Sequence, residues 1–404
     1  MSNKVIIVGA GAAGLSLSVM LKRAVPSLSV TLFEAGDRVG RKLAVTGNGR
    51  CNITNLNTSA DRYHGDAEFA SRLLNGFPYS EQKAFFSEIG IIFTTLEEGK
   101  VYPMSLQATS VVDALRFKAE ELGVKTVIKA PVGDIKRLDG GFSFTACGKQ
   151  ETCRVLVIAT GGQAGGKLGS TDGYAMLKTM GHKIETVFPS LVQLKTAPEV
   201  VRQLKGIKIM AMVTAVSSVG TRSEYGEVLF CDYGLSGPPI LQVSRLGNGD
   251  NMTVSLDIVP DMTEAEIKSE LLHRKEIFAG RSMAELFTGF LHKRLGQIIL
   301  KCVGVDLNSD CEALNEQAAA RSAEILKDWR FKVTGTTGFE NAQVTAGGAQ
   351  TAQFFDTCMS KKAKGLFAVG EVLNVDGDCG GFNLAFAWAS AHAAADGIKE
   401  YLNL

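Results

Sequence analysis

Hydrophobic and polar positions at the start of the chain follow the order strand, turn, helix, strand. Residues 5–8 are apolar and β-branched, residues 12–24 carry apolar side chains at helical spacing, and residues 30–33 form a second apolar run. Gly9 separates the first strand from the helix, and Pro26 marks the end of the helix. This order predicts a β-α-β unit.

The same pattern predicts further elements up to residue 188. We expect helices at residues 78–89, 108–122 and 173–180. We expect strands at residues 91–95, 100–102, 124–130, 132–138, 142–145 and 154–159. Asp139-Gly140-Gly141 is typical of a hairpin turn. We therefore expect residues 124–130, 132–138 and 142–145 to form a small antiparallel layer.

The pattern changes near Pro189. Short apolar runs separated by loops follow, which favour a β-barrel or a sandwich, at residues 191–195, 207–216, 227–231 and 252–259. Beyond them, Thr263 with Glu266 and Ser282 with Glu285 have the spacing of capping boxes, so each pair is predicted to open a helix. Helical spacing continues over residues 293–302 and 311–329.

The last part of the chain returns to the first pattern, with a buried-type strand at residues 365–369 and a helix at 384–397. We therefore expect a domain in two segments with a second unit inserted between them. The expected boundaries are 1–188 and 336–404 for the two segments and 189–335 for the insertion. Within the insertion, we expect a β part at about 189–260 and 329–335 and a helical part at about 261–328.

Composition narrows the choice of partners. The 404 residues include 43 basic and 42 acidic side chains, so there is no electrostatic signature of a nucleic-acid or membrane partner, and a small-molecule substrate is favoured. The eight cysteines are scattered without metal-site spacing, which favours free thiols in a reducing cytoplasm. We expect no signal peptide, no membrane span and no metal. Nothing in the composition indicates the oligomeric state.

Three glycines in the first turn point to a dinucleotide. Gly9 permits the sharp turn, Gly11 lets a phosphate approach the backbone, and Gly14 lets the helix pack on the sheet. The free N–H groups at the helix start, at Ala12 and Ala13, then face the anion. Glu34, with Ala35 beside it, follows the second strand at the distance at which a carboxylate accepts hydrogen bonds from an adenosine ribose. Taken alone, this stretch allows either NAD or FAD.

Other glycine-rich loops provide more backbone donors for a ligand. Residues 35–43, which include Arg41 and Lys42, and residues 46–55 form a long loop suited to a pyrophosphate or a flavin edge. Thr160-Gly161-Gly162 follows a strand in the same way, and Val132 is placed to contact an adenine. Residues 161–167 match the start of a P-loop, but Leu168 stands where that motif needs Ser or Thr, which excludes an NTPase. Cys51 has no neighbouring cysteine to resolve a disulfide, so we interpret it as a packing thiol.

Motifs along nearly the whole chain resemble the YhiN/BaiN-like family of FAD-binding flavoproteins, which includes aminoacetone-oxidase-type enzymes. They are residues 40–43 with 47–52, then 159–162, 169–171, 233–238, 343–348 and 370–383. Two segments depart from the family pattern. Residues 163–167 lack its proline-bearing turn, and Cys231-Asp232 replaces a Thr-His-like pair, which bears on the identity of the substrate.

The resemblance implies an α/β fold, with a Rossmann-like FAD-binding domain of the two-dinucleotide-binding-domain flavoprotein type interrupted by a β-barrel and a small helical bundle. It implies that Glu34 binds the adenosine ribose, that Glu371 reaches the ribitol or the pyrophosphate, and that backbone N–H groups near Gly381 stabilise the reduced flavin. The full set of cofactor-binding residues expected is Gly9, Gly11, Ala12, Ala13, Gly14, Glu34, Ala35, Arg41, Lys42, Gly47, Asn48, Gly49, Arg50, Cys51, Asn52, Val132, Ala159, Thr160, Gly161, Gly370, Glu371, Asp376, Gly381, Phe382, Asn383 and Leu384.

The expected activity is that of an FAD-dependent oxidoreductase that transfers hydride between flavin N5 and a small organic substrate. The leading interpretation is a reductase that uses NAD(P)H, such as one that reduces an activated carbon–carbon double bond. No second glycine fingerprint follows a strand, so NAD(P)H, if used, docks transiently. One alternative is an oxygen-dependent oxidase of a small amine such as aminoacetone. Another is a flavin-containing module that binds RNA or protein without catalysis. The sequence identifies no catalytic acid or base.

Overall fold

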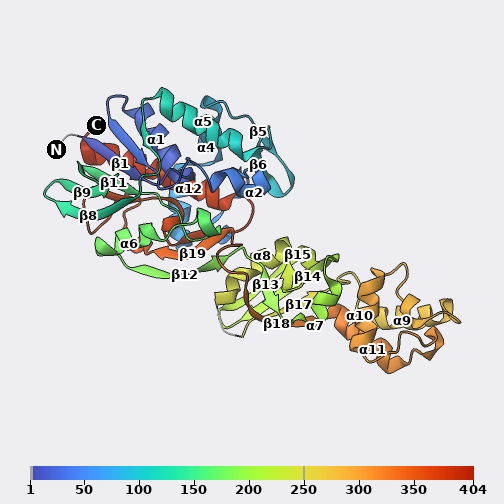
Figure 1. Cartoon of the computed structure of the whole chain (residues 1–404). Coiled ribbons are helices and arrows are strands. Elements are labelled where there is room, and N and C mark those ends of the chain that lie inside the picture. The colour runs from blue at the N-terminus through green and yellow to red at the C-terminus, as the bar shows by residue number, and fades with distance from the viewer. Residues whose placement is uncertain (1–2, 249–250) are drawn as a thin grey trace. The chain divides into compact units, whose positions relative to one another are not determined.

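The computed structural model describes residues 3–248 and 251–404, which divide into two compact units (Figure 1). Unit 1 comprises Met1–Pro189 and Phe339–Leu404, and unit 2 comprises Ser190–Gly338. Each unit has a hydrophobic core of its own. The expected α/β Rossmann-like fold with an inserted β-barrel is confirmed.

Unit 1 is built around a five-stranded parallel sheet in the order β20-β11-β1-β2-β7. The strands are β1 (Lys4–Val8), β2 (Ser29–Phe33), β7 (Lys125–Val127), β11 (Val155–Ile158) and β20 (Leu366–Ala368). Strands β1 and β11 are apolar and buried on both faces, as is typical of a parallel sheet covered by helices. The edge strand β20 comes from the second segment of the unit, so the sheet is completed only after the insertion.

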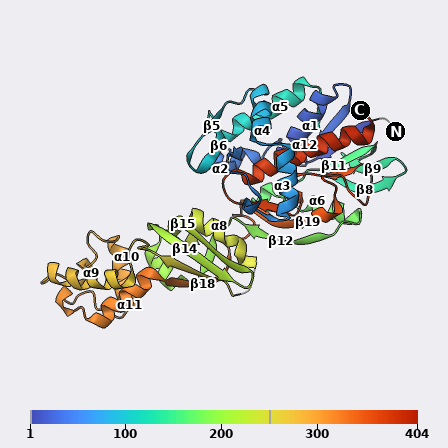
Figure 2. The ribbon, with the colours of Figure 1, turned by 180° about the vertical axis from the view of Figure 1, so that it is seen from behind.

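Helices cover this sheet. Helix α1 (Ala12–Ala24) packs beside α12 (Phe382–Leu402) and α5 (Ala108–Glu121), so the start and the end of the unit lie together (Figures 1 and 2). The remaining helices are α2 (Thr46–Gly49), α3 (Ala67–Gly76), α4 (Tyr79–Glu88) and α6 (Asp172–Thr179). The long α12 is rich in alanine and buried over most of its length, which allows close packing.

Four small sheets complete unit 1. They are β10-β9-β8, β12-β19, β21-β4 and β3-β6-β5. Their strands are β3 (Thr54–Asn55), β4 (Tyr63–Gly65), β5 (Phe93–Thr95), β6 (Lys100–Pro103), β8 (Val132–Leu138), β9 (Gly141–Ala146), β10 (Lys149–Cys153), β12 (Ile184–Ser190), β19 (Val344–Ala349) and β21 (Val375–Gly377). The pairing of β21 with β4 and the β3-β6-β5 sheet position the loops on either side of the start of α12.

Unit 2 contains a closed six-stranded barrel in the order β13-β16-β15-β14-β17-β18. Its strands are β13 (Leu194–Thr196), β14 (Lys208–Ser217), β15 (Gly220–Phe230), β16 (Gly234–Ser236), β17 (Thr253–Asp257) and β18 (Trp329–Thr336). Buried positions alternate with half-buried ones over Ala211–Ala215 of β14 and along β17, as expected when one face fills the barrel. The helices of the unit are α7 (Pro198–Val201), α8 (Pro238–Val243), α9 (Glu264–Ile277), α10 (Lys293–Cys302) and α11 (Glu316–Lys327).

Three sequence-based expectations about elements are wrong. The strand expected at 124–130 is β7, which joins the parallel sheet through β2 and not the antiparallel layer. Ser282 caps only the 3₁₀ turn Met283–Glu285, because the Glu285 carboxylate pairs with Lys293. The helix expected at 311–329 begins at Glu316 and ends at Lys327, and Trp329 starts a barrel strand whose apolar side chains enter the core of the unit. The Thr263–Glu266 capping box is confirmed at the start of α9.

Candidate functional site

The carboxyl ends of four neighbouring strands bring the predicted residues together. Gly9 follows β1, Glu34 follows β2, Ala159 follows β11 and Gly370 lies just beyond β20. Backbone hydrogen bonds extend the ladder past the strand ends, since the Gly9 amide donates to Phe33 and the Ala159 amide donates to Val8. Ligands of open α/β sheets bind at this edge, outside the carboxyl ends of the strands.

The three fingerprint glycines differ in their surroundings. A Cβ on Gly9, whose φ is +106°, would lie 2.4 Å from the Ala159 carbonyl oxygen, and one on Gly14 would lie 2.0 Å from the Gly9 oxygen. A Cβ on Gly11 would meet no atom within 4 Å. Gly11 is also the N-cap of α1, and no side chain caps the helix there. The turn therefore presents uncapped helix N–H groups beside open space, which is the arrangement that binds a phosphate.

Glu34 is fixed beside this turn. Its Oε2 atom accepts a hydrogen bond of 2.9 Å from the Ala10 amide, and its Oε1 atom accepts one of 2.7 Å from the Gly36 amide. The Arg41 side chain lies close by, because a Cβ on Gly36 would be 3.1 Å from Arg41 Nη1. A carboxylate held in this orientation keeps lone pairs for ribose hydroxyls.

Lys42 and Glu371, far apart in the sequence, meet beyond the turn. Lys42 Nζ lies 2.9 Å and 2.6 Å from the two carboxylate oxygens of Glu371, and Glu371 Oε1 also accepts from the Thr345 amide at 2.9 Å. Gly162 belongs to the same group, since a Cβ there would lie 2.5 Å from Thr345 Oγ1. Thr345 is absent from the predicted set although it lies in one of the family motifs. Arg41 and Lys42 are therefore separated, the first beside Glu34 and the second beside Glu371.

The loop at residues 46–55 packs against the start of α12. Asn55 Nδ2 donates to the Gly380 carbonyl at 2.8 Å, and Trp388 Nε1 donates to the Ile53 carbonyl at 2.9 Å. A Cβ on Gly381 would lie 2.5 Å from the Thr54 carbonyl oxygen, so only glycine permits this approach. The two loops that the sequence places at opposite ends of the unit thus form one wall of the site.

The start of α12 has the features of a ligand site. Gly381, with a φ of +98°, is its N-cap, and no side chain caps the helix. Asn52 is 9% exposed, and its Oδ1 atom, 2.8 Å from the Cβ position of Gly381, has no hydrogen-bond partner in the described part of the chain. A buried acceptor beside uncapped N–H groups needs a partner. Together with the open space at Gly11, this fits a dinucleotide that runs from α1 to α12.

Asn383 holds the turn before α12 in place. Its Nδ2 atom donates to the carbonyl oxygens of Gly377 and Asp378, and its Oδ1 atom accepts from the Gly377 amide. Asp378 is bound from the other side by His64, at 2.9 Å, and by Arg62, at 3.6 Å. The turn that carries Cys379 is therefore fixed at both ends.

Several predicted residues are buried or contact other side chains of unit 1. The pKa of the fully buried Cys51 thiol is raised to about 12 by burial, against a smaller opposing effect of its hydrogen bond with Thr46, so it remains neutral as a packing thiol. Asp376 and Val132 are buried in strands β21 and β8. The Arg50 guanidinium lies 5.2 Å from the centre of the Tyr102 ring.

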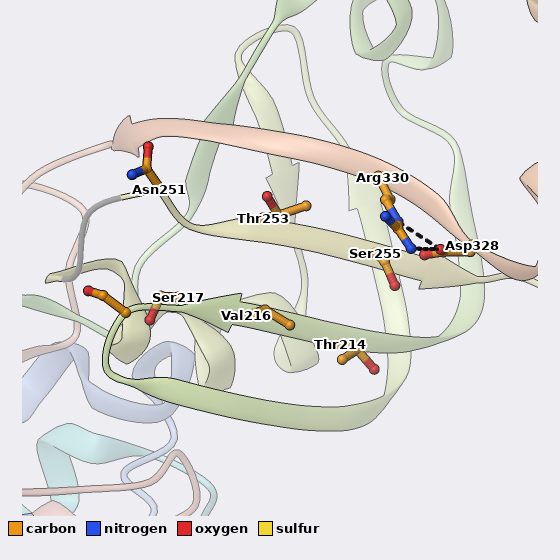
Figure 3. Close-up of a pocket in the computed structure, with 9 residues that line it drawn as sticks. Thr214, Val216, Ser217, Asn251, Thr253, Ser255, Asp328 and Arg330 are labelled. Carbon is orange, nitrogen blue, oxygen red and sulfur yellow. Dashed lines mark hydrogen bonds and ion pairs between the residues drawn. The ribbon is translucent and has the colours of Figure 1, made fainter.

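A separate pocket of about 700 Å³ lies on the outer surface of the barrel (Figure 3). Figure 3 shows it across β14, β17 and β18. The residues that line it are Thr214, Val216, Ser217, Ser218, Asn251, Thr253, Ser255, Asp328 and Arg330. Arg330 Nε donates to Asp328 at 2.7 Å, so the two charged side chains that line the pocket pair with each other. None of the predicted cofactor residues lines this pocket.

Two further findings concern metal binding and membrane insertion. Across residues 3–248 and 251–404, no three His, Cys, Asp or Glu side chains are grouped so as to hold a metal ion. Over the same residues, no helix combines the length and the apolar character needed to cross a bilayer.

Comparison with known proteins places the chain in a family of FAD-dependent oxidoreductases. The model of the HI0933-like protein Rossmann domain matches residues 3–397. A 3-dehydro-bile acid delta(4,6)-reductase of Clostridium scindens is 34% identical, with 98% of this chain and 99% of that protein covered. Ribosomal RNA dihydrouridine synthases of Haemophilus influenzae and Escherichia coli are 28% and 30% identical, covering 98% and 97% of this chain and the same shares of those proteins.

Proposed function

Because the chain belongs to the HI0933-like family of FAD-dependent oxidoreductases, we propose that it binds FAD along unit 1 and reduces a carbon–carbon double bond conjugated to a carbonyl. The observation that carries the proposal is the line of unsatisfied groups from the uncapped start of α1 to Asn52 and the uncapped start of α12. These two helix starts are separate anion-stabilising sites on one unit, as a dinucleotide with a flavin needs.

Each part of the site then holds one part of the cofactor. Glu34 binds the adenosine ribose, with Val132 near the adenine, and the N–H groups of Ala12 to Gly14 bind the pyrophosphate. Lys42 and Glu371 contact the middle of the cofactor beside Gly161. The N–H groups of residues 381–384 stabilise negative charge on the flavin ring, helped by the dipole of α12.

Reduction is favoured over oxidation by the relatives. When bound, FAD supplies the hydride chemistry, and the protein supplies position, charge and a dry environment. The names of the two kinds of relative both describe hydrogenation of a double bond next to a carbonyl, in a 3-oxo bile acid and in uridine. We infer that NAD(P)H is a transient donor, since the sequence of unit 1 carries one dinucleotide fingerprint.

Two substrates of different size are candidates, a small enone and an RNA. A net charge of +1 favours a small apolar enone over an RNA, because binding to phosphates needs a cluster of basic side chains. The expectation of no nucleic-acid partner is nevertheless put in question by the two ribosomal RNA dihydrouridine synthases. The test therefore includes an RNA substrate.

The experiment begins with the purified protein, which is expected to be yellow and to release FAD on denaturation. Anaerobic addition of NADPH or NADH should bleach it, and a 3-oxo-Δ4 bile acid should restore the colour. Reoxidation by a ribosomal RNA transcript but not by the bile acid would assign an RNA substrate. A colourless protein that cannot be reconstituted with FAD, or a yellow one that neither nicotinamide bleaches but aminoacetone does, would refute the reductase.

A further inference from the structure

Cys379 lies in the turn just before α12 and is partly exposed. Its Sγ atom lies 3.9 Å from Gln343 Oε1, within the range of a weak S–H hydrogen bond. The turn is fixed by Asn383 on one side and by His64 and Arg62 on the other, as described above. A thiol on such a turn is held in one place.

The charged groups that face this thiol are Lys100, Asp378 and Glu98. Burial, the largest effect, raises the pKa of the Cys379 thiol, Lys100 lowers it, and the two carboxylates raise it further. The thiol therefore keeps its proton at neutral pH. Lys100 is close, since a Cβ on Gly380 would lie 3.7 Å from Lys100 Cε, and an ammonium there stabilises the thiolate once the proton has left.

A second observation indicates that a ligand lies beside this turn. The Oδ1 atom of the buried Asn52 has no partner in the described residues and lies at Gly381, two positions from Cys379. The hydroxyl of Thr54, also buried and without a partner in the described part of the chain, belongs to the same loop. The turn that carries Cys379 therefore lies beside buried polar atoms without a partner in the described residues, as expected next to a ligand.

We propose that Cys379 donates the proton that completes the reduction of the double bond, an inference that rests on the proposed function. Reduction adds a hydride at the carbon β to the carbonyl, and the reduced cofactor is its source. The S–H bond of Cys379 then breaks, its proton forms the new C–H bond at the α carbon, and the electron pair stays on sulfur as a thiolate beside Lys100. Water returns a proton to the thiolate, so the step consumes no further reductant.

The kinetic test uses FAD-loaded protein reduced anaerobically with dithionite and then mixed with a 3-oxo-Δ4 bile acid or 2-cyclohexenone. Cys379→Ala should slow reoxidation by the enone about 100- to 10,000-fold. Reoxidation by ferricyanide, which takes electrons without a proton from the protein, should be unchanged. Cys379→Ser should restore part of the rate. The solvent deuterium effect on the wild-type step should change in both variants.

The second test measures whether ligands cover the Cys379 thiol, and it needs no turnover. N-ethylmaleimide should label Cys379 in the protein without cofactor, and FAD together with the enone should suppress that labelling, as measured by mass spectrometry. Cys302→Ala, at another exposed thiol, is the control and should leave every rate unchanged.

The outcomes distinguish this inference from the proposed function. A reduced wild-type protein that neither an enone nor the ribosomal RNA transcript reoxidises would overturn both. A wild type that reacts normally beside an equally fast Cys379→Ala, or a thiol labelled equally with and without ligands, would overturn the role of Cys379 alone.

Discussion

Single glycines of the dinucleotide turn serve different purposes. We expect Gly11→Ala to leave stability nearly unchanged, because its Cβ enters open space at a φ of −83°, but to weaken FAD binding at least 100-fold by occupying the path of the phosphate. Gly14→Ala should cost about 3 kcal/mol of unfolding free energy, because its Cβ would overlap the Gly9 oxygen. Urea unfolding and FAD titration measure the two effects. Equal losses of stability in both variants would contradict this assignment.

His182 gives unit 1 a pH dependence. It is 4% exposed, stacks on Phe354 and hydrogen-bonds Ser360, and burial, followed by the nearby Lys362, lowers its pKa from 6.5 to about 4. Below pH 6.5 the His182 side chain therefore binds a proton in the unfolded chain, whereas in the folded chain it stays neutral until near pH 4. Stability present above pH 6.5 is therefore lost as the pH falls, by about 1–2 kcal/mol at pH 5.

This loss is measured by urea unfolding at pH 7 and pH 5. In His182→Gln the difference between the two pH values should shrink by the stated amount. His273→Gln, at an exposed position of α9, is the control and should behave as the wild type. An unchanged pH dependence in His182→Gln would show that another group is responsible.

Residues whose function depends on local spacing could be predicted from the sequence, whereas those placed by long-range contacts could not. Gly9 and Glu34 follow strands directly, so the β-α-β order alone puts them at one edge of the sheet. Thr345 and Lys100 reach the site only through contacts with distant loops. Ordinary polar residues carry no signal of such contacts in a single sequence.

At the scale of elements, the turn before α12 should depend on Asn383. Asn383→Ala removes bonds of 2.7 Å and 2.8 Å to Gly377 and leaves buried backbone groups without partners. We expect a loss of about 1–3 kcal/mol in unfolding free energy and a weaker affinity for FAD. Asn383→Asp, which retains the acceptor, should lose less. Asn308→Ala, at an exposed position of unit 2, is the control, and an Asn383→Ala protein with full FAD affinity would contradict the prediction.

The types of the elements follow from apolar periodicity, but their partners do not. Helices α1 and α5 and strands β1 and β2 lie where the pattern predicts them. The pattern at 124–130 specified a strand, yet its pairing with β2 depends on residues almost a hundred positions earlier. For the same reason the short strands β4 and β21, which pair with each other, are invisible to local periodicity.

At the scale of the whole molecule, two separate cores predict two unfolding events. Each unit buries its own apolar cluster, so differential scanning calorimetry of the full chain should resolve two transitions. FAD at about 100 times its Kd should add about 2.7 kcal/mol to the free energy of unfolding of unit 1. The midpoint of that transition should rise by about 5–10 °C, while the midpoint of unit 2 stays unchanged. Gly11→Ala should abolish the shift. A single transition that moves as a whole would contradict independent units.

The place of β20 in the parallel sheet has a consequence for biosynthesis. When the first segment leaves the ribosome, β11 has no neighbour on its outer side, because β20 is encoded beyond the whole of unit 2. The nascent chain therefore displays an open apolar strand edge, a template for aggregation, while the barrel is being translated. The cofactor cannot shield it during that interval, since α12 follows β20. We expect newly made chains to depend on a chaperone that binds this edge.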